Sequence, residues 1–214
     1  MSRILICGRG ESLINYKKLI DRKFDYVYLI NAFNKFIIDD PDLCLFLQKK
    51  VQEGAEIIQI VNIELPGLDK NLIETLKIKE VQCTRLKATK EKVWWREYFD
   101  SNRFKKSLGI KIECQPECLE PYMGMLENSI GVPILNSILE KNAKKITIIG
   151  SDFYEADYFL SYKSADWAIC SLKTTQDRLK AGMNRLIEAF PHIAFEIITH
   201  STYSNNFKNC KINQ

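Results

Sequence analysis

The first apolar run of the chain, Ile4–Cys7, passes directly into Gly8-Arg9-Gly10, and Ser12 follows where a helix would begin. Such a run predicts a buried β-strand. A strand joined to a helix through glycines presents backbone N–H groups and a positive helix end to an anion. We therefore expect Gly8 and Gly10 to hold a nucleotide phosphate and Ser12 to cap the helix. The alternative is that the glycines only form a tight turn in an α/β protein.

This glycine turn differs from that of NAD-binding proteins. The third glycine of the dinucleotide fingerprint is replaced by Leu13. Asn31 stands after the second predicted strand, where an acidic residue would bind the ribose. Both differences argue against a nicotinamide cofactor, and Asn31 also argues against S-adenosylmethionine. The turn predicts nucleotide binding of another kind.

The rest of the chain alternates apolar runs with helical patterns. The predicted strands, several without polar alternation as in buried parallel strands, are Asp25–Ile30, Leu43–Leu47, Glu56–Val61, Val81–Leu86, Ile110–Cys114, Ile146–Ile149 and Phe195–Ile198. The segments with apolar residues three and four apart, which predict helices, are Ser12–Ile20, Lys70–Lys77, Lys90–Leu108, Ser129–Asn142 and Thr174–Phe190.

This alternation predicts an α/β fold with a doubly wound, mostly parallel sheet and helices on both faces. With 214 residues the chain is expected to form a single Rossmann-like nucleotide-binding domain over residues 1–214. Within it we expect a helical segment at about residues 88–128 and a polar, loosely held tail at residues 201–214.

Composition excludes several classes of protein. The seven cysteines are an odd number without Cys-x-x-Cys pairs, which favours a reduced cytoplasmic interior over a disulfide framework or a zinc site. The net charge of +4 is mild and hints only at anionic substrates or a membrane surface, not at nucleic acid. Ile4–Cys7 is too short for a signal peptide, and no run is long enough to span a bilayer. We expect a cytoplasmic protein, with peripheral contact at the inner membrane as an alternative.

Three further patches are candidates for a site. The aromatic residues of Trp94–Phe99 could line a sugar or nucleobase site, or could be core residues of a helix. In Glu127–Val132, Asn128 or Ser129 can cap an apolar helix. The segment Ile148–Tyr154 ends a buried strand with a glycine, an acid and a tyrosine, at the sheet edge where a doubly wound fold binds its ligands.

Taken in order, these segments resemble those of the small bacterial sialyltransferases that act on lipooligosaccharide, which have a variant of the single-Rossmann glycosyltransferase fold. The family begins strand-Gly-Asn-Gly-Pro-Ser-Leu, which corresponds to Gly8–Leu13 here, and its Cys-Asn-Gln-Phe corresponds to Ile30–Phe33. A Phe-x-Asn at the end of its third strand corresponds to Phe46-Leu47-Gln48, and its Thr-Ser-Gly-Val to Asn128–Val132. Its Tyr-Leu-Ser-Gly-Ile-Asp-Phe-Tyr corresponds to Ile148–Tyr154. The last is the most specific, and the resemblance runs from Arg3 to about Leu179.

The resemblance implies transfer of a sialic acid or a related 2-keto sugar acid from a CMP-activated donor to a glycan or glycolipid acceptor. The donor-binding residues that it implies are Gly8, Arg9, Gly10, Ser12, Asn31, Gln48, Asn128, Ser129, Gly131 and Gly150. Tyr154 would donate a hydrogen bond to the departing phosphate, so that no divalent metal and no other cofactor is expected. Kdo transfer is an alternative, and so is a nucleotide-binding or interaction module that has kept the fold without the chemistry. A homo-oligomer is also compatible with the family.

The chain departs from the family at the reacting groups. The family's second tyrosine falls on Leu160, which Tyr158 and Tyr162 flank. If Asp177 corresponds to the family's helix-opening aspartate, the general-base histidine falls on Leu172, which cannot take a proton.

Carboxylates are the substitutes that we consider for that base. They are Glu127, Glu155 and Asp157, with Asp152 as the nucleophile of a retaining mechanism; Asp152 could instead cap backbone amides in a turn. His192 and His200 are interpreted as structural or surface residues.

Two further positions have alternative interpretations. Arg9, in place of asparagine, either adds a cation to the phosphate site or fills its space. The pair Asp39-Asp40 before Pro41 is interpreted as a solvated turn or helix cap and not as a metal site.

Overall fold

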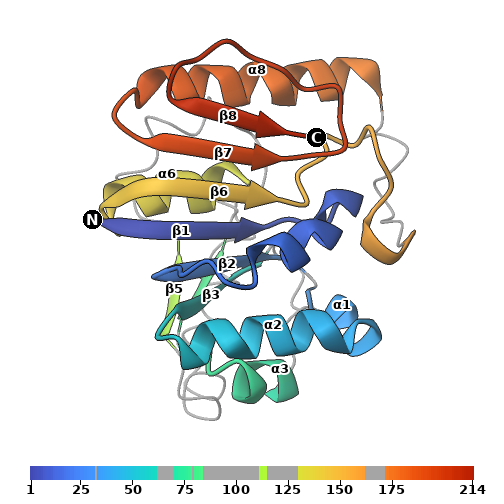
Figure 1. Cartoon of the computed structure of the whole chain (residues 1–214), viewed down its shortest axis with the longest axis vertical. Helices are drawn as coiled ribbons and strands as arrows, with labels where there is room; N and C mark the ends of the chain where they lie inside the picture. The colour runs from blue at the N-terminus through green and yellow to red at the C-terminus, as the bar shows by residue number, and fades with distance from the viewer. Residues whose placement is uncertain (32, 62–69, 79, 84–110, 115–129, 162–171) are drawn as a thin grey trace, which may run out of the picture.

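The computed structural model describes residues 1–31, 33–61, 70–78, 80–83, 111–114, 130–161 and 172–214 (Figure 1). The strands are β1 (Ser2–Cys7), β2 (Tyr26–Ile30), β3 (Glu56–Val61), β4 (Glu80–Cys83), β5 (Lys111–Cys114), β6 (Ala143–Ile149), β7 (Ala194–Ile198) and β8 (Cys210–Asn213). The helices are α1 (Asn34–Asp39), α2 (Pro41–Gln52), α3 (Lys70–Thr75), α6 (Gly131–Leu139) and α8 (Lys173–Ala189), with 3₁₀ segments η1 (Glu11–Leu19) and η4 (Phe159–Ser161).

The described strands form one eight-stranded sheet in the order β5-β4-β3-β2-β1-β6-β7-β8, and every pairing is parallel. The chain moves outward from β1 to β5 and then returns to the other side of β1 as β6. This confirms the predicted doubly wound α/β fold. The strand order reverses between β1 and β6, and ligands bind outside the carboxyl ends of the strands at such a point.

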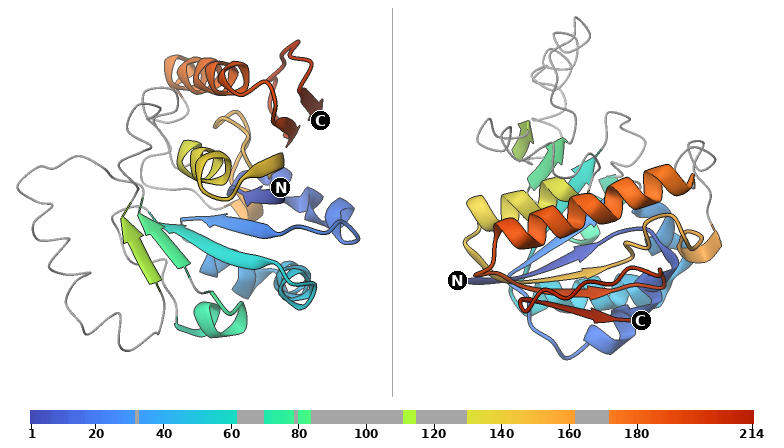
Figure 2. Two further views of the ribbon diagram at one scale, coloured as in Figure 1. Left: turned by 90° about the vertical axis from the view of Figure 1, so that its left-hand side faces the viewer. Right: turned by 90° about the horizontal axis from the view of Figure 1, so that it is seen from above.

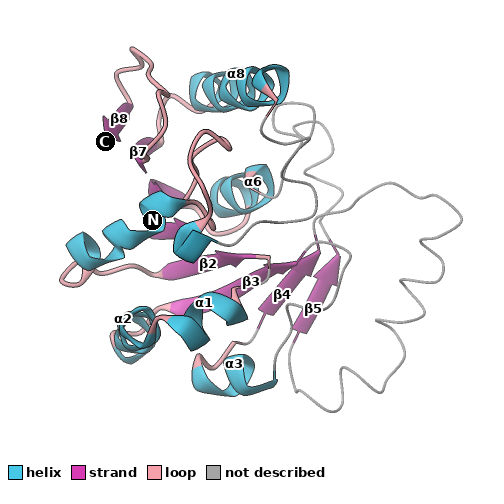
Figure 3. Ribbon diagram, turned by 90° about the vertical axis from the view of Figure 1, so that its right-hand side faces the viewer, coloured by secondary structure: helices cyan, strands magenta, loops and turns pink. Residues whose placement is uncertain are grey.

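Both faces of the sheet are covered by helices. Along β1, Leu5 and Cys7 belong to one core cluster with residues of η1, α1, α2 and α3. Ile4 and Ile6 belong to the other cluster, with residues of α6 and α8. Figures 2 and 3 show these two groups of helices on opposite sides of the strands. The alternation of side chains along each strand thus divides the apolar core into two layers.

The predicted strand Leu43–Leu47 is wrong, because this segment lies in α2. Its buried residues are Leu43, Phe46, Leu47 and Lys50, which have helical spacing. The run of five apolar residues, Leu43–Leu47, suggested a strand, and the helical spacing of the buried positions was hidden because the fourth of them is a lysine. Asp40 caps the helix by accepting a hydrogen bond from the Leu43 N–H at 3.1 Å, and Pro41 follows at its first position. The interpretation of Asp40 as a helix cap is confirmed.

Lys50 is fully buried, with its ammonium group at the end of η1. Nζ donates to the carbonyl oxygens of Ile20 at 2.6 Å and Arg22 at 2.7 Å, and to Glu53 Oε2 at 2.9 Å. A buried ammonium is tolerated only when its three donors are satisfied, as they are here. Lys50 therefore joins α2 to the chain that leads from η1 into β2.

The C-terminal tail is more ordered than the sequence indicated. Residues Cys210–Asn213 form β8, which pairs in parallel with β7 from Phe195 to Ile198. Asn209 Nδ2 donates to the carbonyl oxygens of Ile187, Phe190 and Ile193. The expectation of a loosely held tail is wrong, because backbone pairing and this asparagine hold a segment that has few apolar residues.

Several other expectations concern segments beyond the described part of the chain. They include the helix Lys90–Leu108, the aromatic patch Trp94–Phe99 and the end of the predicted strand Val81–Leu86, whose beginning is confirmed by β4. Among the described helices, none is long and apolar enough to cross a membrane.

Replacing Lys50 with Ala is expected to lower the free energy of unfolding by about 3–5 kcal/mol, because it leaves two carbonyl oxygens and Glu53 without their buried cation. Lys49→Ala is the matched control. Its side chain is 41% exposed in its ion pair with Asp21, and its removal should change stability by no more than about 1 kcal/mol. Urea unfolding followed by circular dichroism measures both. Equal effects of the two substitutions would contradict the role given to Lys50.

Candidate functional site

An open cavity lies at the carboxyl ends of β1, β2 and β6, at the point where the strand order reverses. Three segments that are remote in sequence line it: Gly8–Gly10 after β1, Asn31 after β2 and Gly150–Tyr154 after β6. Tyr158 closes one side of it, and Ile30, Ile130 and Leu179 supply apolar surface. These segments thus meet at the carboxyl edge of the sheet, where the sequence predicts the site.

The ends of β1 and β6 approach so closely that no side chain fits between them. A Cβ atom on Gly8 would lie 2.2 Å from the carbonyl oxygen of Gly150, and one on Gly150 would lie 2.5 Å from that of Gly8. Gly150 also has a φ of +69°, which favours glycine. These two glycines are therefore required by the packing of backbone on backbone.

The backbone N–H groups of the glycine turn bind within the protein. Gly8 N donates to Ile149 O and Gly10 N to Gly150 O, both at 2.8 Å. Glu11 N donates to Asp157 O at 2.9 Å. The amides of Gly8 and Gly10 are therefore engaged within the protein, as the tight-turn alternative predicts.

Ser12 does not cap the helix either. The N-cap of η1 is Gly10, and Ser12 lies inside the 3₁₀ segment. Its hydroxyl accepts a hydrogen bond from Gly150 N at 3.0 Å, and its own N–H donates to Asp152 Oδ2 at 2.8 Å. Ser12 thus binds the loop after β6 to the turn after β1.

Asp152 is a buried carboxylate that is fully engaged by the protein. Besides Ser12 N, it accepts hydrogen bonds at Oδ1 from Thr199 Oγ1 and His200 N, each at 2.9 Å. A carboxylate with these partners has the contacts of a cap on backbone amides. The structure thus supports this alternative over that of a nucleophile. Thr199 and His200 follow β7, and nothing in the sequence motifs pointed to them.

Tyr154 lines the cavity on a strained turn. Phe153 and Tyr154 have φ values of +51° and +60°, which bulky residues rarely adopt. The ring of Phe153 packs against Tyr203 at 4.7 Å, and Gln176 of α8 donates to the Tyr154 carbonyl at 3.0 Å. Asn31, directly after β2, and Leu160, in η4, have φ values of +61° and +59°. Strain of this kind persists where surrounding contacts over-determine the backbone, and it is frequent at functional sites.

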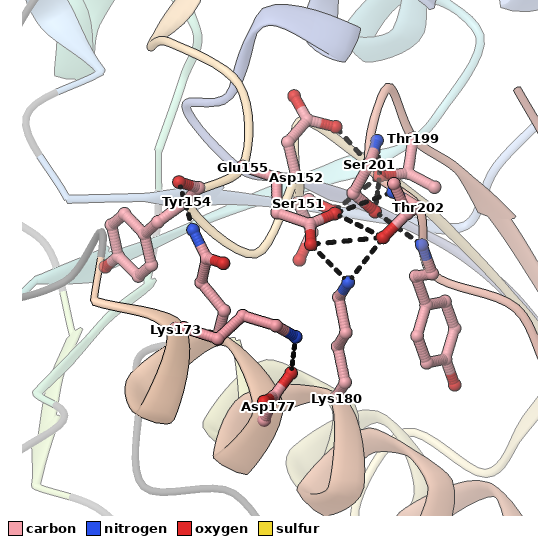
Figure 4. A network of polar contacts seen from close by, with 12 residues as sticks. Ser151, Asp152, Tyr154, Glu155, Lys173, Asp177, Lys180, Thr199, Ser201 and Thr202 are labelled. Atoms are coloured by element: carbon pink, nitrogen blue, oxygen red, sulfur yellow. Dashed lines mark hydrogen bonds and ion pairs between the residues drawn. The ribbon is translucent and has the colours of Figure 1, made fainter.

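A polar network holds the residue after Tyr154 (Figure 4). Glu155 accepts from Lys180 Nζ of α8 at 2.5 Å and from the Thr202 N–H at 2.6 Å. Burial raises the pKa of Glu155, but the hydrogen bonds from Lys180 and Thr202 outweigh it and bring the pKa below its ordinary value. Figure 4 shows the ring of Tyr154 pointing away from this network. A carboxylate held in this way is a poor general base, and Glu155 instead fixes the loop.

Arg9 and Tyr158 form a stacked pair at the cavity. The guanidinium carbon of Arg9 lies 4.7 Å from the ring centroid of Tyr158, and Nη2 donates to the Tyr158 hydroxyl at 3.4 Å. The rings of Tyr154 and Tyr158 lie 6.2 Å apart. Of the tyrosines that could replace the one missing at Leu160, Tyr158 thus lies beside Tyr154.

Other predicted site residues lie elsewhere. Gln48 is in α2 and not at the end of the third strand, which is β3, and it is not among the residues that line the cavity. Gly131 is the first residue of α6 and is buried, and its neighbour Ile130 lines the cavity instead.

Leu172, in the position of the family's base, is the exposed N-cap residue of α8. Asp177 follows in the first half of α8 and pairs with Lys173. Glu127, Asn128, Ser129 and Tyr162 lie outside the described residues.

Within the described ranges, no group of three or more histidine, cysteine, aspartate or glutamate side chains is placed to bind a metal ion. The ring of His200 contacts two residues of η1. Its Nε2 lies 3.3 Å from Asn15 Nδ2, and its Nδ1 lies 3.7 Å from Glu11 Oε2. His192 is exposed beside the ring of Phe190. Neither is among the residues that line the cavity.

Comparison with known proteins gives a structural likeness alone. No family model matches the chain, and no curated protein does. A solved structure described as the sialyltransferase CST-II in complex with trisaccharide acceptor and CMP matches with a TM-score of 0.49 and 15% identity, over 97% of this chain and 86% of that chain. At this score and identity, the match does not by itself assign a function.

Gly8→Ala is expected to destabilise the ligand-free protein by more than about 3 kcal/mol, because its Cβ would meet backbone atoms that cannot move aside. Gly54→Ala is the control. Its φ is +96° but nothing lies within 4 Å of its Cβ, so the cost should be limited to about 1–2 kcal/mol of backbone strain. Thermal unfolding without ligand compares the two. If Gly8→Ala unfolds at the wild-type temperature, the glycine is not required by packing.

Proposed function

We propose that the protein is a glycosyltransferase that moves a sialic acid or a related 2-keto sugar acid from a CMP-activated donor to a glycan acceptor. The observation that carries this proposal is the convergence of three segments, Gly8–Gly10, Asn31 and Gly150–Tyr154, on one cavity. These are segments on which the resemblance to the bacterial sialyltransferases rests. Residues that match by sequence and also meet in space are better evidence of a shared site than either finding alone.

The chemistry of such a donor suits this cavity. Breaking the glycosidic bond leaves a phosphate monoester, CMP, whose charge develops as the bond lengthens. A neutral hydroxyl that donates a hydrogen bond to this phosphate stabilises the transition state more than the ground state. Tyr154 is proposed for this role, because it lines the cavity from a backbone held by Gln176 and by the contacts of Glu155.

No divalent metal is included in the proposal. A single phosphate can be stabilised by hydrogen-bond donors and one cation. Of the Asp39-Asp40 pair, Asp39 ends α1, and Asp40 caps α2 and accepts from the Tyr16 hydroxyl. It is therefore already engaged in a structural role.

A second candidate is a nucleotide-binding module without transferase activity. The observation that favours it is the lack of an evident base, since Asp152 is the one acid among the described cavity-lining residues and both of its oxygens accept hydrogen bonds from the protein. Leu172 cannot replace the family histidine. Release of CMP from CMP-Neu5Ac or CMP-Kdo supports the transferase, whereas binding of CMP without turnover supports the module.

The protein is expected to bind CMP more tightly than UMP, GMP or AMP, because the resemblance is to enzymes with cytidine donors. Isothermal titration calorimetry with the four nucleotides tests this. Equal affinities, or no binding at all, would remove the donor assignment and leave an α/β protein of another function.

Tyr154→Phe is expected to lower turnover by about 100- to 1000-fold, corresponding to roughly 2–4 kcal/mol of lost transition-state stabilisation, with little change in CMP affinity. The matched control is Tyr26→Phe, which removes a hydroxyl from a residue in β2 that does not line the cavity. CMP release from the sugar donor, assayed with a chelator present, gives the rates. Full turnover by Tyr154→Phe would mean that Tyr158 or Tyr162 donates the hydrogen bond to the departing phosphate. Loss of wild-type turnover in the presence of the chelator would mean that the reaction needs a divalent metal.

A further inference from the structure

Four backbone N–H groups of the glycine turn are already engaged within the protein and do not face a ligand anion. A phosphate at the start of a helix is ordinarily held by free backbone N–H groups. Here the amides of Gly8, Gly10, Glu11 and Ser12 donate to Ile149, Gly150, Asp157 and Asp152. A ligand anion in this cavity therefore needs another donor.

Arg9 is the one cationic residue among the described residues that line the cavity, and the protein fixes its position. Its carbonyl oxygen accepts from Phe159 N at 2.7 Å, and the adjacent Gly10 forms an antiparallel bridge with Tyr158. These contacts hold the Arg9 backbone against the segment that carries the Tyr158 ring. The guanidinium then stacks on that ring, with 4.7 Å from its carbon to the ring centroid. Stacking orients the plane of an arginine while leaving N–H groups at its edge to bind a ligand.

Arg9 also forms no ion pair with an acidic side chain in the part of the chain that the structure describes. Among the described residues, Arg22 pairs with Glu196 and Lys180 with Glu155, whereas the Arg9 side chain contacts Tyr158. Asp152 lines the same cavity, but its oxygens face Ser12, Thr199 and His200. A partly buried guanidinium in this state can form charge-assisted, bidentate hydrogen bonds with an oxyanion.

We propose that Arg9 binds the oxyanion of the ligand in this cavity and that Tyr158 is its positioning residue. The proposal rests on the proposed function for the identity of the ligand, a CMP-linked sugar acid. Such a ligand carries two oxyanions, the phosphate and the carboxylate of the sugar. Both have the geometry that a guanidinium recognises, so the structure assigns the chemistry and the experiment separates the two sources.

The test is calorimetry on the full chain with cytidine, CMP and CMP-Neu5Ac, and with uridine and UMP for comparison. In Arg9→Gln, the advantage of CMP over cytidine should fall by about 10- to 100-fold if Arg9 binds the phosphate, the range for loss of hydrogen bonds to a charged group. If it binds the carboxylate, the advantage of CMP-Neu5Ac over CMP should fall instead. In both cases the affinity for cytidine should stay at the wild-type value.

Three variants serve as controls. Arg9→Lys keeps the charge without the planar fork and should be intermediate. Arg185→Gln removes the same charge from an exposed position of α8 and should change neither advantage. Tyr158→Phe keeps the ring under the guanidinium but removes the hydroxyl that accepts from Arg9 Nη2, so it should lose less of the anion-dependent affinity than Tyr158→Leu, which removes both. Thermal unfolding of each variant shows whether it is folded.

The outcomes separate this proposal from the proposed function. If Arg9→Gln keeps both advantages, the role of Arg9 is wrong even where CMP is preferred over UMP. If the wild type does not distinguish CMP from UMP, yet Arg9→Gln loses the advantage of each over its nucleoside, the anion site stands and the cytidine donor is wrong. If the wild type binds none of these ligands, both are overturned.

Discussion

The buried carboxylate of Asp152 holds together the chain segments that meet at the carboxyl end of the sheet. It binds the N–H of Ser12 after β1, and the hydroxyl of Thr199 and the N–H of His200 after β7, while its own backbone belongs to the loop after β6. A buried charge is stable only when donors surround it, so the three loops must adopt mutually consistent positions. The same carboxylate explains why position 10 is glycine, since a Cβ there would lie 2.5 Å from Asp152 Oδ2.

The strained turn at Phe153 and Tyr154 depends on this anchor. Asp152 fixes its beginning, and Glu155, bound to Lys180 and Thr202, fixes its end. Two bulky residues can remain in the left-handed region because both flanks and the Phe153 ring are held. The result is a tyrosine placed at the cavity before any ligand arrives. Such preorganisation is what a group needs in order to stabilise charge that appears only in a transition state.

The site differs from a phosphate loop of the usual kind in the source of its positive potential. In a phosphate loop the potential comes from backbone N–H groups and the helix end, and the sequence requires glycines for that reason. In this protein the glycines serve the contact of β1 with β6, and the cavity acquires a cation from the side chain of Arg9. Glycines in such a turn can be required either for phosphate binding by backbone N–H groups or for close contact between two strands. The hydrogen-bond partners of the glycine amides distinguish the two cases.

The sequence by itself determined the elements whose periodicity is local. The apolar runs of β1, β2, β3, β6 and β7, and the helical spacing of α8, follow from burial of one face or both, and with their alternation they predict the doubly wound sheet and the edge where the cavity lies. Only the tertiary structure decided the features that depend on partners remote in sequence. The buried side of helix α2 includes Lys50, whose ammonium group binds carbonyl oxygens at the end of η1, and β8 forms by pairing with β7. The amides of Gly8 and Gly10 bind residues about 140 positions away, and Asp152 meets His200 across 48 positions. No local pattern records such contacts, because their free energy depends on which loops the completed sheet brings together.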